Sequence, residues 1–245
     1  MSFTYSPSIV KDGLVFYLDA ANPKSYISGD TTCTDLVGGN VGSLNGDVRL
    51  IPNYGGGWEF DNLNDYILFT NSAFANPEST SFTCNIFLEQ DDVGYSQNVY
   101  LSKGNGGSGN IGWSITYNNL YSGNTIVVRC NGNDTITQRA SQAFPHAIGK
   151  VSMITMVINR SDNTIKGYLN GSNVGWLDGG NGPTSNDISG FNPITTSLYN
   201  LKIGTRSDGA IDFGGVNHLV QLYSRALSQS EITRNYNALK GRFGL

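Results

Sequence analysis

Charged residues are scarce in this chain of 245 residues. Only 14% of them are charged, the formal net charge is -4, and the sequence contains no cluster of Lys and Arg. A protein that binds nucleic acid needs such a cluster to neutralise phosphates. The composition therefore argues against a nucleic-acid partner.

Long apolar runs are missing as well. No stretch approaches the roughly 20 apolar residues that a membrane-spanning helix needs. The first twenty residues also lack a basic region followed by an apolar run of signal-peptide length. We therefore expect neither a membrane partner nor a signal peptide.

Cysteine and histidine are few. Cys33, Cys84 and Cys130 make an odd number without the spacing of metal ligands. We expect Cys84 and Cys130 to be reduced core residues, because they lie on apolar faces of predicted strands. His146 and His218 have no recognisable partners for a catalytic triad or a zinc site.

Glycine and aromatic residues, by contrast, are abundant, with 31 Gly and 11% Phe, Trp and Tyr. About a dozen short apolar runs alternate with turn residues, among them five Asn-Gly and three Asp-Gly pairs. Such pairs are typical of hairpin turns, and neither βαβ spacing nor a linker interrupts the pattern. The sequence predicts one all-β domain, a sandwich of two antiparallel sheets.

The first core strand is predicted where Leu14, Phe16 and Leu18 alternate with Val15, Tyr17 and Asp19. Residues 1–12 before it are expected to be an arm or an edge strand, and residues 31–45 a loop rich in Gly and Asn. Residues 151–158 are almost entirely apolar, which predicts a central strand covered on both faces.

One helix is predicted, at the C-terminal end, over residues 228–239. Ser228 and Glu231 form a capping box, in which each side chain bonds the backbone amide of the other residue. Ile232, Tyr236 and Leu239 share one apolar stripe, so we expect the helix to pack on a sheet. The domain then spans residues 13–239, and residues 240–245 are expected to form a tail.

Five motifs in order carry a resemblance to a known family. They are residues 13–26 (GLVFYLDAANPKSY), 58–67 (WEFDNLNDYI), 165–171 (IKGYLNG), 201–204 (LKIG) and 222–232 (LYSRALSQSEI). Together they resemble the laminin-G-like branch of the concanavalin A-like lectin/glucanase jelly rolls. The opening of the chain and residues 235–245 are similar to versions of this module in structural proteins of tailed bacteriophages, including phages of cyanobacteria.

The chain departs from the family pattern at a few positions. The family commonly has Trp where Cys33 and Val151 stand, and it often has an acidic residue where Asn217 stands. If that carboxylate helps to hold calcium in relatives, the resemblance implies that the site is weakened or absent here.

Glycosidases on this fold resemble one another in a strand motif, Glu-x-Asp-x-x-Glu, which holds a nucleophile and an acid about 5 Å apart. None of the four glutamates, Glu59, Glu78, Glu89 and Glu231, lies in such a motif. The segment Glu89-Gln90-Asp91-Asp92 comes nearest, but it is expected to be a solvated turn. We therefore expect no enzyme activity on this plan.

Carbohydrate binding on a jelly roll needs an exposed aromatic ring together with Asn, Asp and backbone donors on loops. The candidates are Trp176, Asp178, Asn181, Asn186 and Asp208. Turn formation explains the polar residues equally simply, and Trp176 could pack at a strand end. Calcium is a possible cofactor, with Asp61, Asp65 and Asp212 as candidate oxygen ligands, although no compact Asp-x-Asp loop marks a site.

The leading hypothesis for function is a non-enzymatic virion component, a jelly roll mounted on a phage head, neck or tail. Its expected partners are other virion proteins and copies of itself, and its location is the virion. The alternative is an adhesin that binds host surface polysaccharide, and a glycoside hydrolase is the least favoured. The fold alone cannot choose between them, because it hosts all three kinds of protein.

Overall fold

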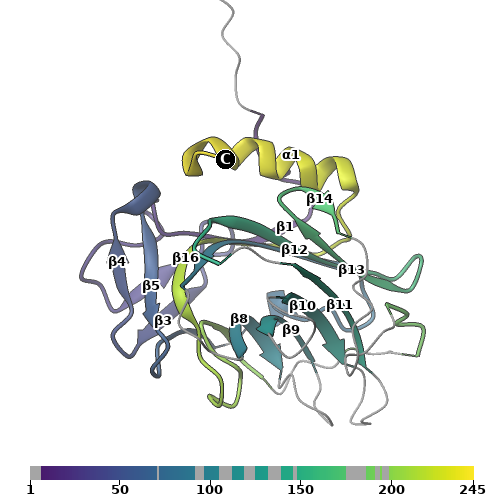
Figure 1. The fold of residues 1–245 in the computed structure, drawn as a ribbon, viewed down its shortest axis with the longest axis horizontal. Helices are drawn as coiled ribbons and strands as arrows, with labels where there is room; N and C mark the ends of the chain where they lie inside the picture. The colour runs from purple at the N-terminus through teal and green to yellow at the C-terminus, as the bar shows by residue number, and fades with distance from the viewer. Residues whose placement is uncertain are drawn as a thin grey trace, which may run out of the picture.

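Two antiparallel β-sheets, stacked face to face, make up most of the chain (Figure 1). The computed structural model describes residues 7–70, 72–91, 97–104, 112–118, 125–131, 139–145, 148–174, 186–190, 194 and 199–245. The predicted all-β sandwich with one short C-terminal helix is confirmed.

The first sheet has its strands in the following order: β14 (Ser172–Asn173), β13 (Thr164–Leu169), β12 (Ser152–Asn159), β7 (Phe82–Gln90), β16 (Gly214–Tyr223), β5 (Gly57–Asp61) and β4 (Arg49–Ile51). Strand β1 (Leu14–Asp19) also pairs with β16. Because β5 pairs with residues 214–217 of β16 and β1 with residues 219–223, β5 and β1 follow each other along one edge of that strand.

The second sheet has the following strand order: β11 (Arg139–Pro145), β10 (Thr125–Asn131), β9 (Gly112–Asn118), β8 (Gln97–Gly104), β15 (Leu201–Ile203), β6 (Tyr66–Phe69), β3 (Val41–Asn45) and β2 (Thr32–Thr34). Short 3-10 turns lie at η1 (Asn53–Gly55), η2 (Ala73–Ala75) and η3 (Lys240–Phe243). The structure corrects the loop expected over residues 31–45, which contributes β2 and β3 to this sheet.

Apolar side chains from both sheets fill the space between them. Trp58, Ile86 and Leu222 of the first sheet share this core with Trp113 and Ile203 of the second. Cys33, Cys84 and Cys130 are buried there as free thiols, and burial raises the pKa of each. The expectation that Cys84 and Cys130 are reduced core residues is confirmed.

A second apolar layer covers the outer face of the first sheet, beneath helix α1 (Gln229–Leu239) (Figure 1). Ile232 of the helix is fully buried against this face, whereas Tyr236 and Leu239 are half-buried. The polar residue Asn235 is buried more deeply than either of them. The helix therefore packs on the sheet as predicted, but its buried side is shifted from Tyr236 and Leu239 toward Asn235. None of the helices in the described part of the chain has the length and apolar character to cross a membrane.

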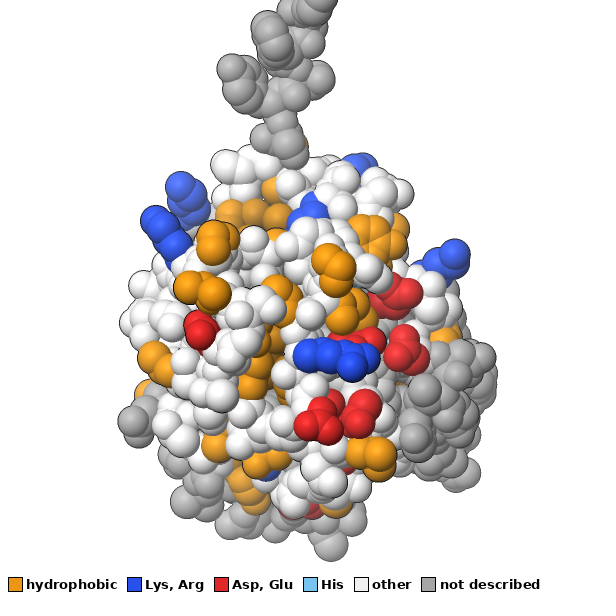
Figure 2. Space-filling model, turned by 90° about the vertical axis from the view of Figure 1, so that its left-hand side faces the viewer, with side chains coloured by type: hydrophobic (Ala, Val, Ile, Leu, Met, Phe, Trp, Pro, Cys, Tyr) orange, Lys and Arg blue, Asp and Glu red, His pale blue; other side chains and the backbone are white. Residues whose placement is uncertain are grey.

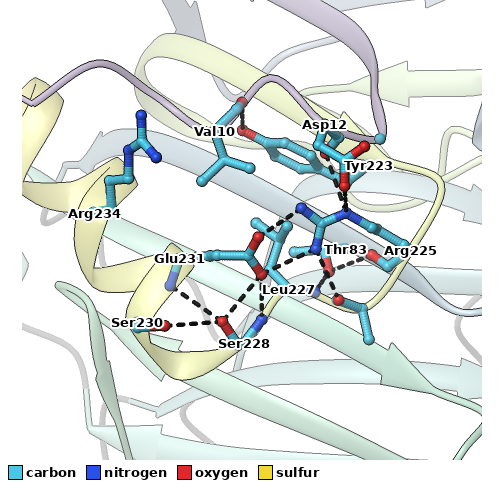
Figure 3. A network of polar contacts seen from close by, with 12 residues as sticks. Val10, Asp12, Thr83, Tyr223, Arg225, Leu227, Ser228, Ser230, Glu231 and Arg234 are labelled. Carbon is cyan, nitrogen blue, oxygen red and sulfur yellow. Dashed lines mark hydrogen bonds and ion pairs between the residues drawn. The ribbon is translucent and has the colours of Figure 1, made fainter.

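The start of the helix is held by the predicted capping box, extended by an arginine (Figure 3). The Ser228 hydroxyl accepts from the Glu231 amide at 3.4 Å, and the Glu231 carboxylate accepts from the Ser228 amide at 2.9 Å. Both guanidinium NH2 groups of Arg225 donate to the same carboxylate, at 2.9 and 2.6 Å. This arginine lowers the pKa of Glu231 to about 2.

The N-terminal arm is tied to the helix by a buried polar triangle. The Val10 amide donates to Asn235 Oδ1 at 2.7 Å, and Asn235 Nδ2 donates to the Tyr223 hydroxyl at 2.9 Å. That hydroxyl donates to the Val10 carbonyl at 3.1 Å (Figure 3). The end of the arm therefore has a fixed position against α1 and β16.

The residues expected to form a C-terminal tail, 240–245, are docked instead, which corrects the prediction. Residues 240–243 form η3, and Phe243 is buried against Phe87 with ring centroids 4.8 Å apart. Arg242 pairs with Asp19 at 2.7 Å and donates to the Gly56 carbonyl at 2.9 Å. An aromatic ring and a guanidinium thus extend the domain beyond residue 239.

Candidate functional site

Two hollows on the first sheet are the candidate binding sites. One, which we call the acidic cavity, lies at the β4–β5 end and has a volume of about 290 Å³. The other, which we call the β1 groove, lies over the outer face of β1 and has a volume of about 490 Å³. Binding sites for small ligands occupy roughly 300–1,000 Å³, so both sizes are compatible with a sugar unit.

The acidic cavity is lined by five carboxylates and one guanidinium, with Phe60 among them. The acidic residues are Asp47, Glu59, Asp61, Asp65 and Asp91, and the basic one is Arg49. Figure 2 shows the side of the molecule that carries β4 and β5, where a basic side chain lies between groups of acidic ones. This hollow therefore attracts cations and repels anions.

Most of these carboxylates already have protein partners. Asp65 is buried and accepts from the amides of Asp47, at 2.6 Å, and Asp61, at 3.0 Å. Asp61 accepts from the Leu63 amide at 2.8 Å, and Glu59 forms an ion pair with Arg49. The acidic cavity is thus built largely from side chains that hold the turns around it.

Asp61, Asp65 and Asp212 were the predicted calcium ligands. Asp61 and Asp65 do meet in the acidic cavity, while Asp212 accepts from the Asn64 amide at 3.0 Å and from the Thr205 hydroxyl at 2.7 Å. Across the described ranges, no three His, Cys, Asp or Glu side chains are grouped as metal ligands. All three residues accept hydrogen bonds within the protein, and calcium binding stays a prediction.

The β1 groove has a different composition. Its apolar wall consists of Ile9, Leu14, Leu36 and Val37, and its polar groups belong to Lys11, Tyr17, Asn22 and Lys24. Small-molecule sites are mostly apolar with a few placed polar groups, and the β1 groove has that composition. It is the hollow that better fits a sugar, whose ring has both apolar CH faces and hydroxyls.

A β-bulge in β1 creates this wall. The register against β16 shifts between Leu14 and Phe16, so Leu14 leaves the inner face and joins Tyr17 on the outer one. Phe16 and Leu18 stay in the core between the sheets. The expectation that Leu14 shares a face with them is therefore wrong, because a bulge adds one residue and reverses the alternation before it.

Tyr17 is held in place by a chain of polar contacts that reaches the C-terminus. Its hydroxyl donates to Asp19 Oδ2 at 3.1 Å, and Asp19 Oδ1 pairs with Arg242 at 2.7 Å. Burial, followed by the charge of Asp19, raises the pKa of Tyr17, so the phenol keeps its proton. Its oxygen therefore offers the groove a fixed acceptor.

Lys11 and Lys24 are exposed at the groove. Within the ranges that the structure describes, neither ammonium group forms an ion pair. Asn22 Oδ1 accepts from the Lys24 amide at 3.0 Å, which leaves the side-chain NH2 of Asn22 as a donor. The residues that line the groove thus include side chains that can donate, Lys11, Asn22 and Lys24, and a phenol that can accept, Tyr17.

The residues predicted to bind carbohydrate do not form one site in the described structure. Trp176, Asp178 and Asn181 lie outside the described residues. Asn186 contributes its backbone carbonyl to the Ile165 amide at 2.9 Å, and Asp208 forms a two-residue ion pair with Arg206. The Asp208 pair matches the turn interpretation, the Asn186 carbonyl bonds across to β13, and carbohydrate binding stays a prediction for all five residues.

Three further sequence expectations concern polar residues near the first sheet. Glu89 lies within β7 and is half-buried, which corrects the turn expected there, although Asp91 follows the strand directly. His218 is buried, its Nδ1–H donates to the Gly56 carbonyl at 3.0 Å, and burial lowers its pKa to about 4. Asn217 faces the core opposite Trp58 and Leu88, so that position is internal in this chain.

The sequence matches the profile of the concanavalin A-like lectin/glucanases superfamily over residues 60–233. That is well over half of the chain, so the protein belongs to this superfamily, as the five motifs predicted. No curated protein sequence matches the chain significantly.

Solved structures with the same fold share little sequence with the chain. The receptor binding domain of botulinum neurotoxin C/D mosaic serotype superposes with a TM-score of 0.66 and 14% identity, over 91% of this chain and 51% of that one. Trypanosoma rangeli sialidase gives a TM-score of 0.66 and 16% identity, over 96% of this chain and 34% of the sialidase. The chain thus spans about half, or less, of these proteins, and the likeness shows the fold alone.

A third similar structure is that of botulinum neurotoxin type C, whose cell entry depends on interaction with two ganglioside molecules. It superposes with a TM-score of 0.63 and 16% identity, over 93% of this chain and 51% of that one.

The sequence did not reveal the residues of the β1 groove. Lys11 belonged to the expected arm, and Lys24 lies in the first family motif without a pattern that marks it as a binding residue. The one available signal is the segment Asn22-Pro23-Lys24 in the first family motif, where an exposed turn follows directly on the strand. The apolar wall could not be foreseen without the bulge.

Proposed function

We propose that this chain is a non-enzymatic carbohydrate-binding module and that the β1 groove holds the sugar. The observation that carries the proposal is the groove itself, about 490 Å³ in volume, which combines an apolar wall with a fixed phenol, an amide and two ammonium groups. A sugar ring needs this mixture, because its CH faces pack on apolar side chains while its hydroxyls need donors and acceptors.

The superfamily and the similar structures support this proposal. The fold is lectin-like, and one similar structure belongs to a toxin described by its interaction with gangliosides, while another is a sialidase. The similar solved structures share only 14–17% sequence identity with this chain, which is too little to transfer the role of a residue. The binding residues proposed here therefore come from this chain alone.

A glycan array probed with the full chain tests the proposal, and two exposed valines provide a matched pair of variants. Val37 lines the β1 groove and is 48% exposed, whereas Val41 is 57% exposed and is not part of the lining. Val37→Glu should weaken binding to any glycan hit at least about tenfold, the usual effect of losing one well-placed contact. Val41→Glu should bind as the wild type does. Equal loss in both variants would contradict the assignment of the site.

The place where the module acts is the second part of the proposal. We propose a tailed-phage virion, with other virion proteins and copies of the chain as partners and host surface polysaccharide as ligand. The similarity of its opening and of residues 235–245 to phage structural proteins supports this. Antibody labelling of purified particles should detect the chain on the virion, and its absence from them would overturn this part.

One observation favours a second candidate function, glycoside hydrolysis in the acidic cavity. Asp91 and Glu59 both line this cavity, and the pKa of Asp91 is raised by partial burial first and by Glu59 second. Hydrolysis with two carboxylates requires one of them to hold its proton. We favour the binding module because Arg49 occupies the Glu59 carboxylate and Asp91 is exposed. Release of reducing sugar by the wild type, lost in Glu59→Gln, would support the hydrolase instead.

A further inference from the structure

We propose that the ligand of the β1 groove is an anionic sugar, a sugar unit that carries a carboxylate or sulfate group. The inference rests on the proposed function, that the groove binds carbohydrate. It goes further by fixing the chemical class of the sugar from the charges and hydrogen-bonding groups that the groove presents.

The two lysines supply the charge argument. Lys11 and Lys24 are contributed by different segments, the N-terminal arm and the turn after β1, and both border the same hollow. No carboxylate lies among the described residues that line it, and the nearby Asp19 is paired with Arg242 at 2.7 Å. Two ammonium groups without a counterion in the described structure favour a ligand that brings the negative charge.

Hydrogen bonds hold the backbone segments that carry these two lysines. The arm that carries Lys11 is tied down by Val10, whose amide and carbonyl are both bonded within the polar triangle. The turn that carries Lys24 is closed by the Ser25 amide, which donates to the Asn22 carbonyl at 2.8 Å, and by the bond to Asn22 Oδ1. The backbone segments that carry the two lysines are therefore both held by hydrogen bonds, and both lysines border the same hollow.

The phenol supplies the argument for hydroxyls. Because Tyr17 donates its proton to Asp19, its oxygen can only accept from a ligand at the groove. An ammonium group, in turn, can only donate. A ligand that satisfies both must carry an acceptor anion and a hydroxyl donor, and it must have an apolar face for Leu14 and Leu36. An anionic sugar unit has all three features.

Asp35 and the acidic cavity argue against a cationic ligand in the β1 groove. Asp35 lies close to this region, but its carboxylate accepts from the amides of Val37, Gly38 and Asn40 at 2.8, 3.0 and 2.9 Å. Its charge is therefore spread over backbone donors. Five carboxylates line the acidic cavity, and their negative potential repels an anionic sugar, so of the two hollows the β1 groove is the one that can accept it.

Isothermal titration of the full chain with a matched set of sugars tests this inference. The set is 3′-sialyllactose, 3′-sulfated lactose and lactose, which share the lactose core and differ in the substituent at its 3′ position. A short poly-glutamate peptide serves as a non-sugar anion. We expect at least one of the two acidic sugars to bind about tenfold or more tighter than lactose, since hydrogen bonds to charged groups carry that much. We also expect the peptide to bind more weakly than that sugar.

Two variants locate the effect. The double variant Lys11→Gln and Lys24→Gln should reduce affinity for the acidic sugar about tenfold and reduce lactose affinity much less, because glutamine still donates hydrogen bonds but carries no charge. Lys150→Gln, another exposed lysine that does not line the groove, should match the wild type. All three lysines are exposed, so unchanged urea midpoints will show that the variants fold.

The outcomes separate this inference from the proposed function. If lactose binds as tightly as the acidic sugars and the double variant binds normally, the anionic class is overturned while carbohydrate binding stands. Should poly-glutamate bind as tightly as the sugars, the ligand is an anion but not a sugar. If no sugar in the set and none on a wider array binds, both proposals fail.

Discussion

The acidic cavity and the β1 groove differ in what their polar groups are already doing. In the acidic cavity, the carboxylates of Asp65 and Asp61 accept from backbone amides and Glu59 is paired with Arg49. In the β1 groove, the ammonium groups of Lys11 and Lys24 form no ion pair in the described structure. Substitution of charged side chains that hold the fold together should lower stability. Substitution of charged side chains that face solvent should leave stability almost unchanged.

This difference separates stability from binding. Changes in the acidic cavity should lower the free energy of unfolding and leave ligand affinity in the groove unaltered. Changes at the rim of the groove should lower ligand affinity and leave the free energy of unfolding unaltered.

The largest effect should come from pH acting on the buried His218 of β16. Burial lowers the pKa of this histidine to about 4, while an unfolded histidine titrates near 6.5. The unfolded chain therefore binds more protons between these values, and stability should fall as pH drops from about 6.5 to about 4. The loss should approach about 3 kcal/mol, measured by urea unfolding across this range.

Variants identify the group behind this pH dependence. His218→Gln should flatten the profile between pH 6.5 and 4, whereas Asp65→Asn should keep it. Asp65 has the opposite sign, because burial raises its pKa and its contribution to stability is lost as pH rises through the folded pKa. A profile that His218→Gln leaves unchanged would show that another group causes the loss.

The second prediction concerns the core of the acidic cavity. Asp65→Ala should cost about 2–3 kcal/mol of unfolding free energy, because it leaves the amides of Asp47 and Asp61 without acceptors. Asp61→Ala is the control, since Asp61 is exposed and its loss should cost less than about 1 kcal/mol. Sugar affinity in the β1 groove should be the same in both, and a weakened affinity would link the two hollows.

The third prediction tests the chain of contacts behind Tyr17. Arg242→Met should cost about 1–2 kcal/mol, because Asp19 and the Gly56 carbonyl lose a donor. It should also weaken sugar binding a few-fold, since Asp19 no longer fixes the phenol in place. Arg234→Met is the matched control, because this arginine bonds only Ser8, at 2.7 and 2.8 Å, among the described residues. If both variants bind sugar normally, Tyr17 does not depend on this anchor.

The smallest effect is expected at the rim of the acidic cavity. Arg49 is 75% exposed at its side chain, and pairs of this kind contribute little to stability because water screens them. Arg49→Gln should change the urea midpoint by less than the equivalent of about 1 kcal/mol and should leave groove affinity unaltered. A large loss of stability would mean that the pair with Glu59 is structural.

The sequence predicted the architecture well because the spacing of apolar residues and the choice of turn and cap residues are local signals. Asn170-Gly171 forms the hairpin turn expected of it, with φ of 51° and 81°, and the capping box at Ser228 has both of its bonds. The apolar pattern of residues 151–158 likewise predicted the doubly covered strand β12. Each of these features depends on a few neighbouring residues.

The candidate site could not be predicted, because long-range contacts create it. The bulge after Leu14 reverses one step of the alternation, and only pairing with β16 reveals it. Asn235 is polar and so was missing from the expected apolar stripe, yet it binds both Val10 and Tyr223, which are distant in sequence. Arg242 was assigned to a tail and instead reaches Asp19, 223 positions away.

Amide chemical-shift mapping of the full chain during titration with 3′-sialyllactose distinguishes the two hollows in one experiment. We expect shifts at Lys11, Tyr17, Asn22 and Lys24 and none around Glu59 and Asp61. Shifts confined to the residues of the acidic cavity would contradict it.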